Sequence, residues 1–276
     1  MMSDTGSWIG FEREACETVT ERQVREFRVT LDGFLADEDE NPGLHWCLAP
    51  EIYPPADLGR DGHPRLGLFL PDLGLPRRMW AGGRLSYRGG IRAGETITRR
   101  STITDIRFKE GRSGKLGFVT LDHSYLCGQD LRISEQQNIV YREDPSSDAP
   151  TPQPPQAEPW EVIRSIEVLP TSTLLFRYSA MTFNGHRIHY DKIYAIGTEG
   201  YAGLVVHGPL QSTWMQILAA QILKHLPKDF TYRGLSPLIC DRPAVVEARK
   251  REGKLALRVR DLEANVVTME AHTNHH

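Results

Sequence analysis

The chain has 276 residues, of which 39% are apolar and 25% are charged, and its formal net charge is −3. These values are typical of a globular protein with one large domain or two of ordinary size, and the charge excludes general binding of nucleic acid through a basic surface. No apolar run approaches the ~18 residues of a membrane span, the N-terminus lacks a signal-peptide pattern, and the four cysteines show no paired spacing, so we expect a cytoplasmic protein without a membrane partner.

Two pairs of segments resemble each other across the chain. Residues 20–33 (TERQVREFRVTLDG) align with residues 172–185 (STLLFRYSAMTFNG), and residues 79–85 (MWAGGRL) align with residues 205–210 (VVHGPL). We interpret these pairs as the remains of an internal duplication. The alternative is chance similarity between short amphipathic segments.

Residues 41–67 form a long stretch that is rich in glycine and proline. Loops of this length inside a domain are usually functional or disordered. This one contains Trp46, Ile52 and Tyr53 and is followed by Leu68. Because these apolar side chains can anchor the loop, we predict an ordered cover over a site.

Each half of the chain ends in β-rich runs with period-two alternation and short polar turns. The runs cover residues 95–110, 115–126 and 131–143 in the first half, and 244–252, 254–263 and 265–273 in the second. Such patterns predict antiparallel meanders. The runs are long for strands, so the sheets should be strongly curved and should wrap around a helix.

Residues 144–159, DPSSDAPTPQPPQAEP, contain six prolines near the middle of the chain. Proline fixes φ and lacks an N–H donor, so this stretch should be an extended, exposed connector. We therefore predict an N-terminal half over residues 1–143, a linker over 144–159 and a C-terminal half over 160–276.

Residues 209–226, PLQSTWMQILAAQILKHL, predict the helix that a sheet would enclose. Their apolar side chains cover most of the helix surface, which is typical of a buried helix. Pro209 suits the first helical position, and Lys224 and His225 suit the last turn, where the dipole favours positive charge.

Residues 183–191, FNGHRIHYD, bring two histidines, an asparagine and an aspartate together around a glycine. His186, His189, Asp191 and the later His207 carry the groups that zinc prefers. Catalytic zinc pairs usually lie on a helix four residues apart, and the glycine disfavours a helix here, so we predict no metal. A polar bend without function is the remaining alternative.

Several of these motifs resemble a known family. YSAMTFNGHRIHYDKIYA and GLVVHGPL are similar to the MaoC-like and fatty-acid-synthase-like (R)-specific enoyl-CoA hydratases and dehydratases, while EQQNIVYRE and WAGGRLSYRGGIRAGE resemble the branch of itaconyl-CoA and mesaconyl-CoA hydratases. The resemblance implies an α+β double hot-dog fold. Each half would be a curved antiparallel sheet around a central helix, with the N-terminal half degenerate.

The family's motif has an aspartate five residues before a histidine, with an asparagine between them. His189 matches the histidine, Asn184 stands where the aspartate is usual, and His186 takes the position of the asparagine. In the N-terminal half Asp37 lies five residues after Asp32, where a histidine would be needed. We therefore expect this half to be inactive and to shape the acyl pocket.

Hydration of an α,β-unsaturated thioester needs a base, a proton for C2 and donors for the thioester oxygen. We assign the base to His189, whose imidazolium can return the proton to C2, and expect the Asn184 amide to hold the water. Gly208 precedes Pro209 at the start of the buried helix, where N–H groups and the dipole favour an oxyanion. Asp191 either orients the imidazole or supplies the missing acid, unless it caps an Asx-type turn.

Other residues are candidates for substrate binding. Arg84 and Arg233 are predicted to hold the phosphates of coenzyme A, although arginines on strands often lie on a solvated face. Arg187 or His186 can pair with a second carboxylate of the substrate. His207 either lines the pocket or is a hydrogen-bonded core histidine.

The sequence thus predicts a hydro-lyase that adds water reversibly to a short, dicarboxylic enoyl-CoA of the itaconyl or mesaconyl type. Coenzyme A is part of the substrate, no separate cofactor is expected, and a homodimer or higher homo-oligomer is predicted. The alternatives are a hot-dog thioesterase, an acyl-carrier-protein dehydratase and a non-catalytic acyl-CoA-binding subunit. A thioesterase usually carries a carboxylate on the central helix, and PLQSTWMQ has none.

Overall fold

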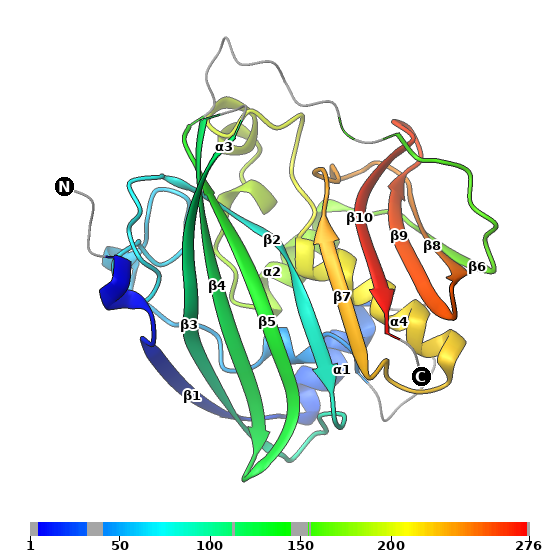
Figure 1. Ribbon diagram of the computed structural model, residues 1–276, viewed down its shortest axis with the longest axis horizontal. Helices are drawn as coiled ribbons and strands as arrows, with labels where there is room; N and C mark the ends of the chain where they lie inside the picture. Colours follow the sequence, from blue (N-terminus) through cyan, green and yellow to red (C-terminus); the bar gives the residue numbers. More distant parts are fainter. Residues whose placement is uncertain (1–4, 32–40, 112–113, 145–153, 155, 275–276) are drawn as a thin grey trace.

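The computed structural model describes residues 5–31, 41–111, 114–144, 154 and 156–274. Asp32, Asp37 and most of the predicted linker lie outside the described residues, so their roles and the domain boundaries stay predictions. The described strands form one antiparallel sheet of ten strands (Figure 1). Among the helices that the structure describes, none is long and apolar enough to cross a membrane.

The strand order is symmetric about the middle of the sheet. From the edges inward it runs β1-β3-β4-β5-β2 on one side and β6-β8-β9-β10-β7 on the other, with β2 paired to β7. The first set comprises β1 (Glu12–Thr18), β2 (Arg77–Tyr87), β3 (Thr96–Gly111), β4 (Gly114–Cys127) and β5 (Asp130–Arg142). The second set comprises β6 (Arg164–Val168), β7 (Asp229–Gly234), β8 (Ala244–Arg251), β9 (Lys254–Asp261) and β10 (Val266–Thr273).

This symmetry agrees with an internal duplication but corrects one of the proposed pairs. Residues 79–85 lie in β2, whose counterpart in the strand order is β7, whereas residues 205–210 lead into a helix. The other pair agrees with the structure, because residues 21–30 and 172–181 are both helical. Short apolar segments can resemble each other through composition alone. The topology shows that one of these two segments is a strand and that the other leads into a helix.

The two predicted meanders, β3–β4–β5 and β8–β9–β10, are confirmed within about a residue or two of the predicted bounds. The long strands carry irregularities where residues are inserted, between Ile103 and Asp105, between Trp80 and Gly82, and between Val267 and Met269. Such bulges bend a strand and increase its twist. They account for the curvature of the sheet around its helix.

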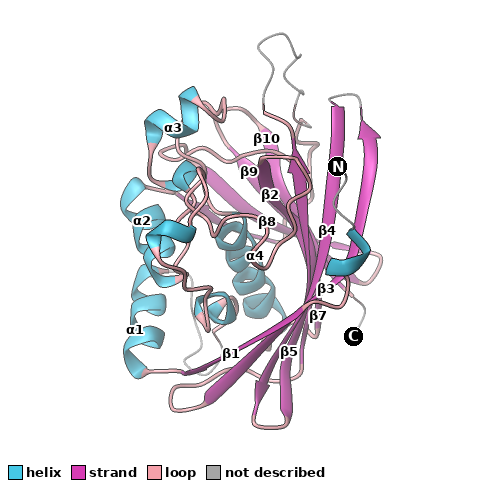
Figure 2. Cartoon of the chain, turned by 90° about the vertical axis from the view of Figure 1, so that its left-hand side faces the viewer, coloured by secondary structure: helices cyan, strands magenta, loops and turns pink. Residues whose placement is uncertain are grey.

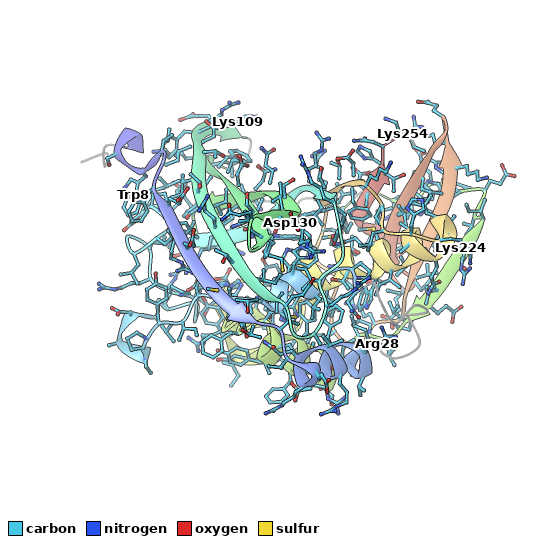
Figure 3. All side chains as sticks on the ribbon, turned by 90° about the horizontal axis from the view of Figure 1, so that it is seen from below. Trp8, Arg28, Lys109, Asp130, Lys224 and Lys254 are labelled. Carbon is cyan, nitrogen blue, oxygen red and sulfur yellow. The ribbon has the colours of Figure 1, made fainter. Side chains whose placement is uncertain are left out.

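The α-helices that the structure describes all lie on one face of the sheet (Figure 2). They are α1 (Glu21–Thr30), α2 (Ser172–Met181), α3 (Lys192–Gly197) and α4 (Gly208–Leu223), and the short 3-10 turns are η1 (Thr5–Trp8), η2 (Leu44–Cys47), η3 (Pro55–Asp57) and η4 (Arg187–His189). Helix α4 lies between the sheet and an outer layer formed by α1, α2 and α3. The view from below shows the same layers, with Arg28 of α1 and Lys109 of β3 on opposite sides of the molecule (Figure 3).

The buried helix is confirmed as α4. Every residue from Leu210 to Ala219 is buried, and Trp214 is fully enclosed by the main core, which joins both sets of strands. The helix ends at Leu223, three residues earlier than predicted, because Lys224 adopts a left-handed conformation with φ +67°. Pro227 follows closely and disfavours helical backbone at the residue before it.

The first set of strands has no comparable helix in the described residues. Between α1 and β2, the described residues 41–76 form an ordered segment with two short 3-10 turns, which we call the covering loop. The fold is therefore the predicted α+β double hot-dog arrangement, with the central helix supplied by the second half.

The covering loop inserts His45 into the main core. Its ring is 1% exposed and packs against Trp46, Tyr87 and Tyr125, and neither ring nitrogen has a hydrogen-bond partner within the described parts of the chain. Burial, with a smaller effect of the Arg99 charge, lowers the pKa of His45 to about 3. The native state therefore holds this imidazole neutral.

Replacing His45 with phenylalanine is expected to weaken the acid sensitivity of the fold. Between pH 6.5 and about 3 the unfolded chain binds a proton that native His45 does not, so the free energy of unfolding falls as the pH falls through this window. In the variant, the decrease in the free energy of unfolding between pH 7 and 5.5 should be smaller than in the native protein by about 1 kcal/mol. Urea denaturation at both pH values measures this difference, and identical losses would show that His45 does not contribute.

Candidate active site

The FNGHRIHYD segment connects α2 to α3 as a tight turn rather than a helix. Phe183 adopts φ +51°, and the Asn184 Oδ1 accepts the backbone N–H of His186 at 2.9 Å. The 3-10 turn η4 then places His189 beneath the surface, and Asp191 caps α3 through the N–H of Tyr194. Local side-chain bonds of this kind compete with helix formation and fix the turn.

His189 has the surroundings of a neutral base. Its ring is 6% exposed, and its Nδ1 lies 2.7 Å from the carbonyl oxygen of Val205. A carbonyl only accepts, so Nδ1 carries the proton and Nε2 is left unprotonated. Burial lowers the pKa of His189 to about 3, although the bond to Val205 opposes this shift.

His189 stacks directly on the residue that precedes α4. The rings of His189 and His207 are parallel within 18° and their centroids are 3.6 Å apart. His207 is fully buried, its Nε2 lies 2.8 Å from the Ser179 Oγ, and burial lowers its pKa well below the usual value. His207 is thus hydrogen-bonded in the core, which is one of the two alternatives considered from the sequence, and its ring also contacts His189. That it lines a substrate pocket stays a prediction.

Gly208 is the first residue of α4, one position before Pro209, which was predicted to begin the helix. Its N–H has no acceptor among the residues that the structure describes, as is common for the first donors of a helix. A Cβ at this position would lie 2.3 Å from Cε3 of Trp80, so glycine is required for the ring to pack against the helix start. Because the His189 ring stacks on His207, the residue before Gly208, it lies next to the half-buried start of α4.

His186 extends the cluster in the opposite direction. Its ring is 8% exposed and lies edge-on to His189 at 5.5 Å, and the ring of His63 lies 4.4 Å from it on the other side. Burial is the main cause that lowers the pKa of His186, and the neighbouring His63 and His189 lower it further. Four imidazoles thus form a row from His63 to His207.

The covering loop docks onto the turn through backbone contacts. The Arg187 N–H donates to the Asp61 carbonyl at 2.9 Å, and the Arg187 Nη1 donates to the Arg60 carbonyl at 3.1 Å. Gly62 and Gly185 approach so closely that a Cβ on Gly62 would lie 2.0 Å from the Gly185 oxygen. The prediction that this loop is an ordered cover is confirmed.

Replacing Gly62 with alanine is expected to separate the loop from the turn and lower kcat about tenfold. This corresponds to an activation free energy that is higher by about 1.4 kcal/mol. The matched control is Gly67→Ala, since Gly67 has a similar positive φ of +91° against +86° but no atom within 4 Å of its added Cβ. Both variants carry the same backbone strain, so the difference in rate reports the contact with Gly185. Equal rates in the two variants would show that loop docking does not matter for catalysis.

Three predicted residues of the turn are already engaged elsewhere. Both carboxylate oxygens of Asp191 are occupied, one by the Tyr194 N–H at 3.0 Å and the other by the Arg187 guanidinium at 2.8 and 3.1 Å. The assignment of Asp191 as the missing acid is therefore replaced by the capping role. Arg187 is likewise held by Asp191 and stacks on the Tyr194 ring, and the Asn184 amide oxygen is used by His186.

Arg84 and Arg233 do not join the histidine cluster. They alternate with the buried Leu85 and Tyr232, so their side chains lie on the face of the sheet opposite α4. Arg84 pairs there with Asp229 at 3.2 Å. Their assignment to the site is thus corrected in favour of the solvated strand face, because alternation along a strand sends neighbouring side chains to opposite sides.

Three further residues, Asp61, His63 and Arg78, lie beside the turn and were not predicted from the sequence. The His63 Nδ1 lies 3.3 Å from Asp61 Oδ2, and the Arg78 guanidinium binds the same carboxylate at 3.1 Å. Burial raises the pKa of the Asp61 carboxyl, but the bonds and charges of His63 and Arg78 outweigh it, so this pKa lies well below its usual range. The sequence DGH in the loop was the available signal.

Asp61, His63 and His186 could each offer one ligand atom to a metal ion, since these atoms lie within 4.8 Å of one another. The Arg78 guanidinium already binds both carboxylate oxygens of Asp61 and places a positive charge beside the group. A cation is disfavoured next to that charge. The same groups are better suited to proton transfer.

Comparisons with known proteins agree with this chemistry. The family model "Hydroxyacyl-thioester dehydratase type 2" matches residues 43–240. A Chloroflexus aurantiacus protein named mesaconyl-C(4)-CoA hydratase is 37% identical, over 95% of this chain and 93% of its own. The mitochondrial hydroxyacyl-thioester dehydratase type 2 of Saccharomyces cerevisiae is 25% identical, over 83% of this chain and 85% of its own.

Solved structures support the fold. A MaoC-like dehydratase from Phytophthora capsici matches with a TM-score of 0.67 at 14% identity, covering 97% of both chains. A Mycobacterium tuberculosis protein described as having a double hotdog fold matches with a TM-score of 0.58 at 12% identity, covering 96% of this chain and 95% of its own. At such low identity, these matches speak for the architecture alone.

Proposed function

Because the chain belongs to the hydroxyacyl-thioester dehydratase type 2 family, we propose that it adds water reversibly to a short, dicarboxylic α,β-unsaturated acyl-CoA of the mesaconyl or itaconyl type. The chain is a lyase of the hydratase and dehydratase class. The observation that carries the proposed mechanism is the stacking of His189 on His207 at the start of α4, with Nδ1 tied to Val205.

In the proposed reaction His189 Nε2 accepts a proton from water as the water oxygen bonds to C3. The electron pair of the double bond moves toward the thioester, whose oxygen becomes negative and accepts the Gly208 N–H. Donors that are already in place at the helix start, together with its dipole, stabilise that charge. An imidazolium of the same cluster then gives a proton to C2, so that one water is added in total.

The dicarboxylic substrate class is supported by the 37% identity to the protein named mesaconyl-C(4)-CoA hydratase. Two residues were candidates for the second carboxylate, and Arg187 is already held by Asp191. We therefore assign the carboxylate to His186. Coenzyme A enters as part of the substrate.

A panel of crotonyl-, itaconyl- and mesaconyl-CoA tests this function. Loss of the enoyl thioester absorbance measures hydration, and we expect it to be fastest with the dicarboxylic thioesters. Release of free thiol at the same rate would indicate a thioesterase instead. Binding of acyl-CoA in a calorimeter without any loss of absorbance would indicate a non-catalytic binding subunit.

A further inference from the structure

The FNGHRIHYD turn lacks a free carboxylate, although the chemistry of its base calls for one. Asn184 cannot accept a proton, and its amide oxygen bonds to the His186 N–H. Asp191 is committed to Arg187 and Tyr194. A second proton-transfer group must therefore come from outside the turn.

The covering loop brings a carboxylate and an imidazole to the same place. Asp61 Oδ1 accepts the His63 backbone N–H at 3.1 Å, and Asp61 Oδ2 lies 3.3 Å from His63 Nδ1. Arg78, which lies in β2, binds the Asp61 carboxylate and donates to the Pro64 carbonyl at 2.6 Å. The loop is therefore held on both sides of His63. A carboxylate at Nδ1 orients an imidazole and stabilises its protonated form.

His63 is the end of the imidazole row that reaches solvent. Its side chain is 28% exposed, whereas His186, the next ring in the row, is 8% exposed. The charged and titratable groups that face His63 are Asp61, His186 and, through Asp61, Arg78. With Nδ1 on Asp61, Nε2 is the nitrogen that remains for a substrate.

We propose that His63 is a second catalytic imidazole of the hydratase site and that Asp61 is its positioning residue. The pair is supplied by the covering loop and takes over the role of the carboxylate that is missing at Asn184. This inference rests on the proposed hydration and names the group that protonates C2.

The two imidazoles divide the reaction between them. His189 accepts the proton of the attacking water while the C3–O bond forms. The resulting enolate takes the Nε2 proton of a doubly protonated His63 to form the C2–H bond, which leaves His63 neutral with its Nδ1–H on Asp61. His189 then holds a proton and His63 lacks one. Return of that proton restores both groups, and His186, whose ring contacts both, lies on the route.

The test uses the reverse reaction, dehydration of a 3-hydroxyacyl-CoA with and without deuterium at C2. His63→Ala is expected to lower kcat about 100-fold. It should also raise the C2 deuterium isotope effect above that of the native protein, because cleavage of the C2–H bond becomes slow. His63→Gln serves as a second variant that fills more of the space left by the ring.

Asp61→Asn is expected to lower kcat about tenfold with little change in KM and to raise the C2 deuterium isotope effect, because the His63 ring loses the carboxylate that orients it. His272→Gln, at an exposed position on β10, is the matched control and should leave the rate and isotope effect unchanged.

Rates of both His63 variants within threefold of the native rate would overturn the inference. So would a loss of rate with an unchanged isotope effect, because packing alone would then explain it. In either case an active native protein and an inactive His189 variant leave the proposed hydration standing. A native protein without activity on any enoyl-CoA removes the proposed function itself.

Discussion

Replacement of His189 by alanine is expected to lower kcat at least about 100-fold, the usual contribution of a positioned base. In the native protein the His189 ring offers its unprotonated Nε2 to the water. The bond from Nδ1 to Val205 and the stacking on His207 fix the orientation of the ring. Alanine leaves the incoming water without an acceptor for its proton. Steady-state hydration of the best enoyl-CoA in the panel measures the effect.

The loss of rate in His189→Ala should come from the missing imidazole and not from a change in the fold. His272→Ala removes a histidine from an exposed site and should keep the native rate. Circular dichroism should show the same secondary structure in both variants, because the neighbours of His189 belong to a turn and a helix start that are held by other contacts. A His189 variant that retains a near-native rate would exclude this residue as the base.

Gly208→Ala should reduce kcat by about 100-fold, the scale of losing one oxyanion donor. The added Cβ would lie 2.3 Å from the Trp80 ring, which cannot move away easily because it stacks on Tyr232 at 4.6 Å and meets Trp46 edge-on. The start of α4 must shift instead. Its N–H groups then no longer point at the position of the thioester oxygen.

Gly197→Ala provides the matched control, because a Cβ added at this helical glycine meets no atom within 4 Å. We expect the control to keep native kcat and KM. Hydration kinetics and thermal unfolding of both variants should be measured together. Native kcat in Gly208→Ala would show that the helix start does not serve the reaction.

Much of the fold could be predicted because its signals are local. The alternation in β3–β5 and β8–β10 and the apolar surface of α4 are periodic within single segments. Strands β1, β2, β6 and β7 were not predicted. Strands β1, β6 and β7 are short, and the alternation of β2 is interrupted by a bulge between Trp80 and Gly82. Their positions depend on pairing with strands far away in the sequence.

The site was predictable only where its residues follow one another in the chain. His186 and His189 lie in one turn, and His207 and Gly208 begin one helix, so their chemistry was visible in the sequence. Asp61 and His63 reach the turn through a contact between two glycines more than a hundred positions apart. No local pattern reports such a contact.

Two arginines were assigned to the site from the sequence although the structure places them elsewhere. Arg84 and Arg233 have the right charge for phosphates, but strand pairing places them on the face away from α4. Charge alone does not decide which side of a sheet a residue occupies. That choice follows from the register, which is set by the buried Leu85 and Tyr232.

The most direct test mixes excess enzyme with the best enoyl-CoA of the panel and follows the enoyl thioester absorbance through one turnover. We expect the native protein to remove the absorbance, while His189→Ala binds the thioester with similar affinity by calorimetry and removes the absorbance at least about 100-fold more slowly. Removal of the absorbance by His189→Ala at the native rate would contradict a base at this position beside the start of α4.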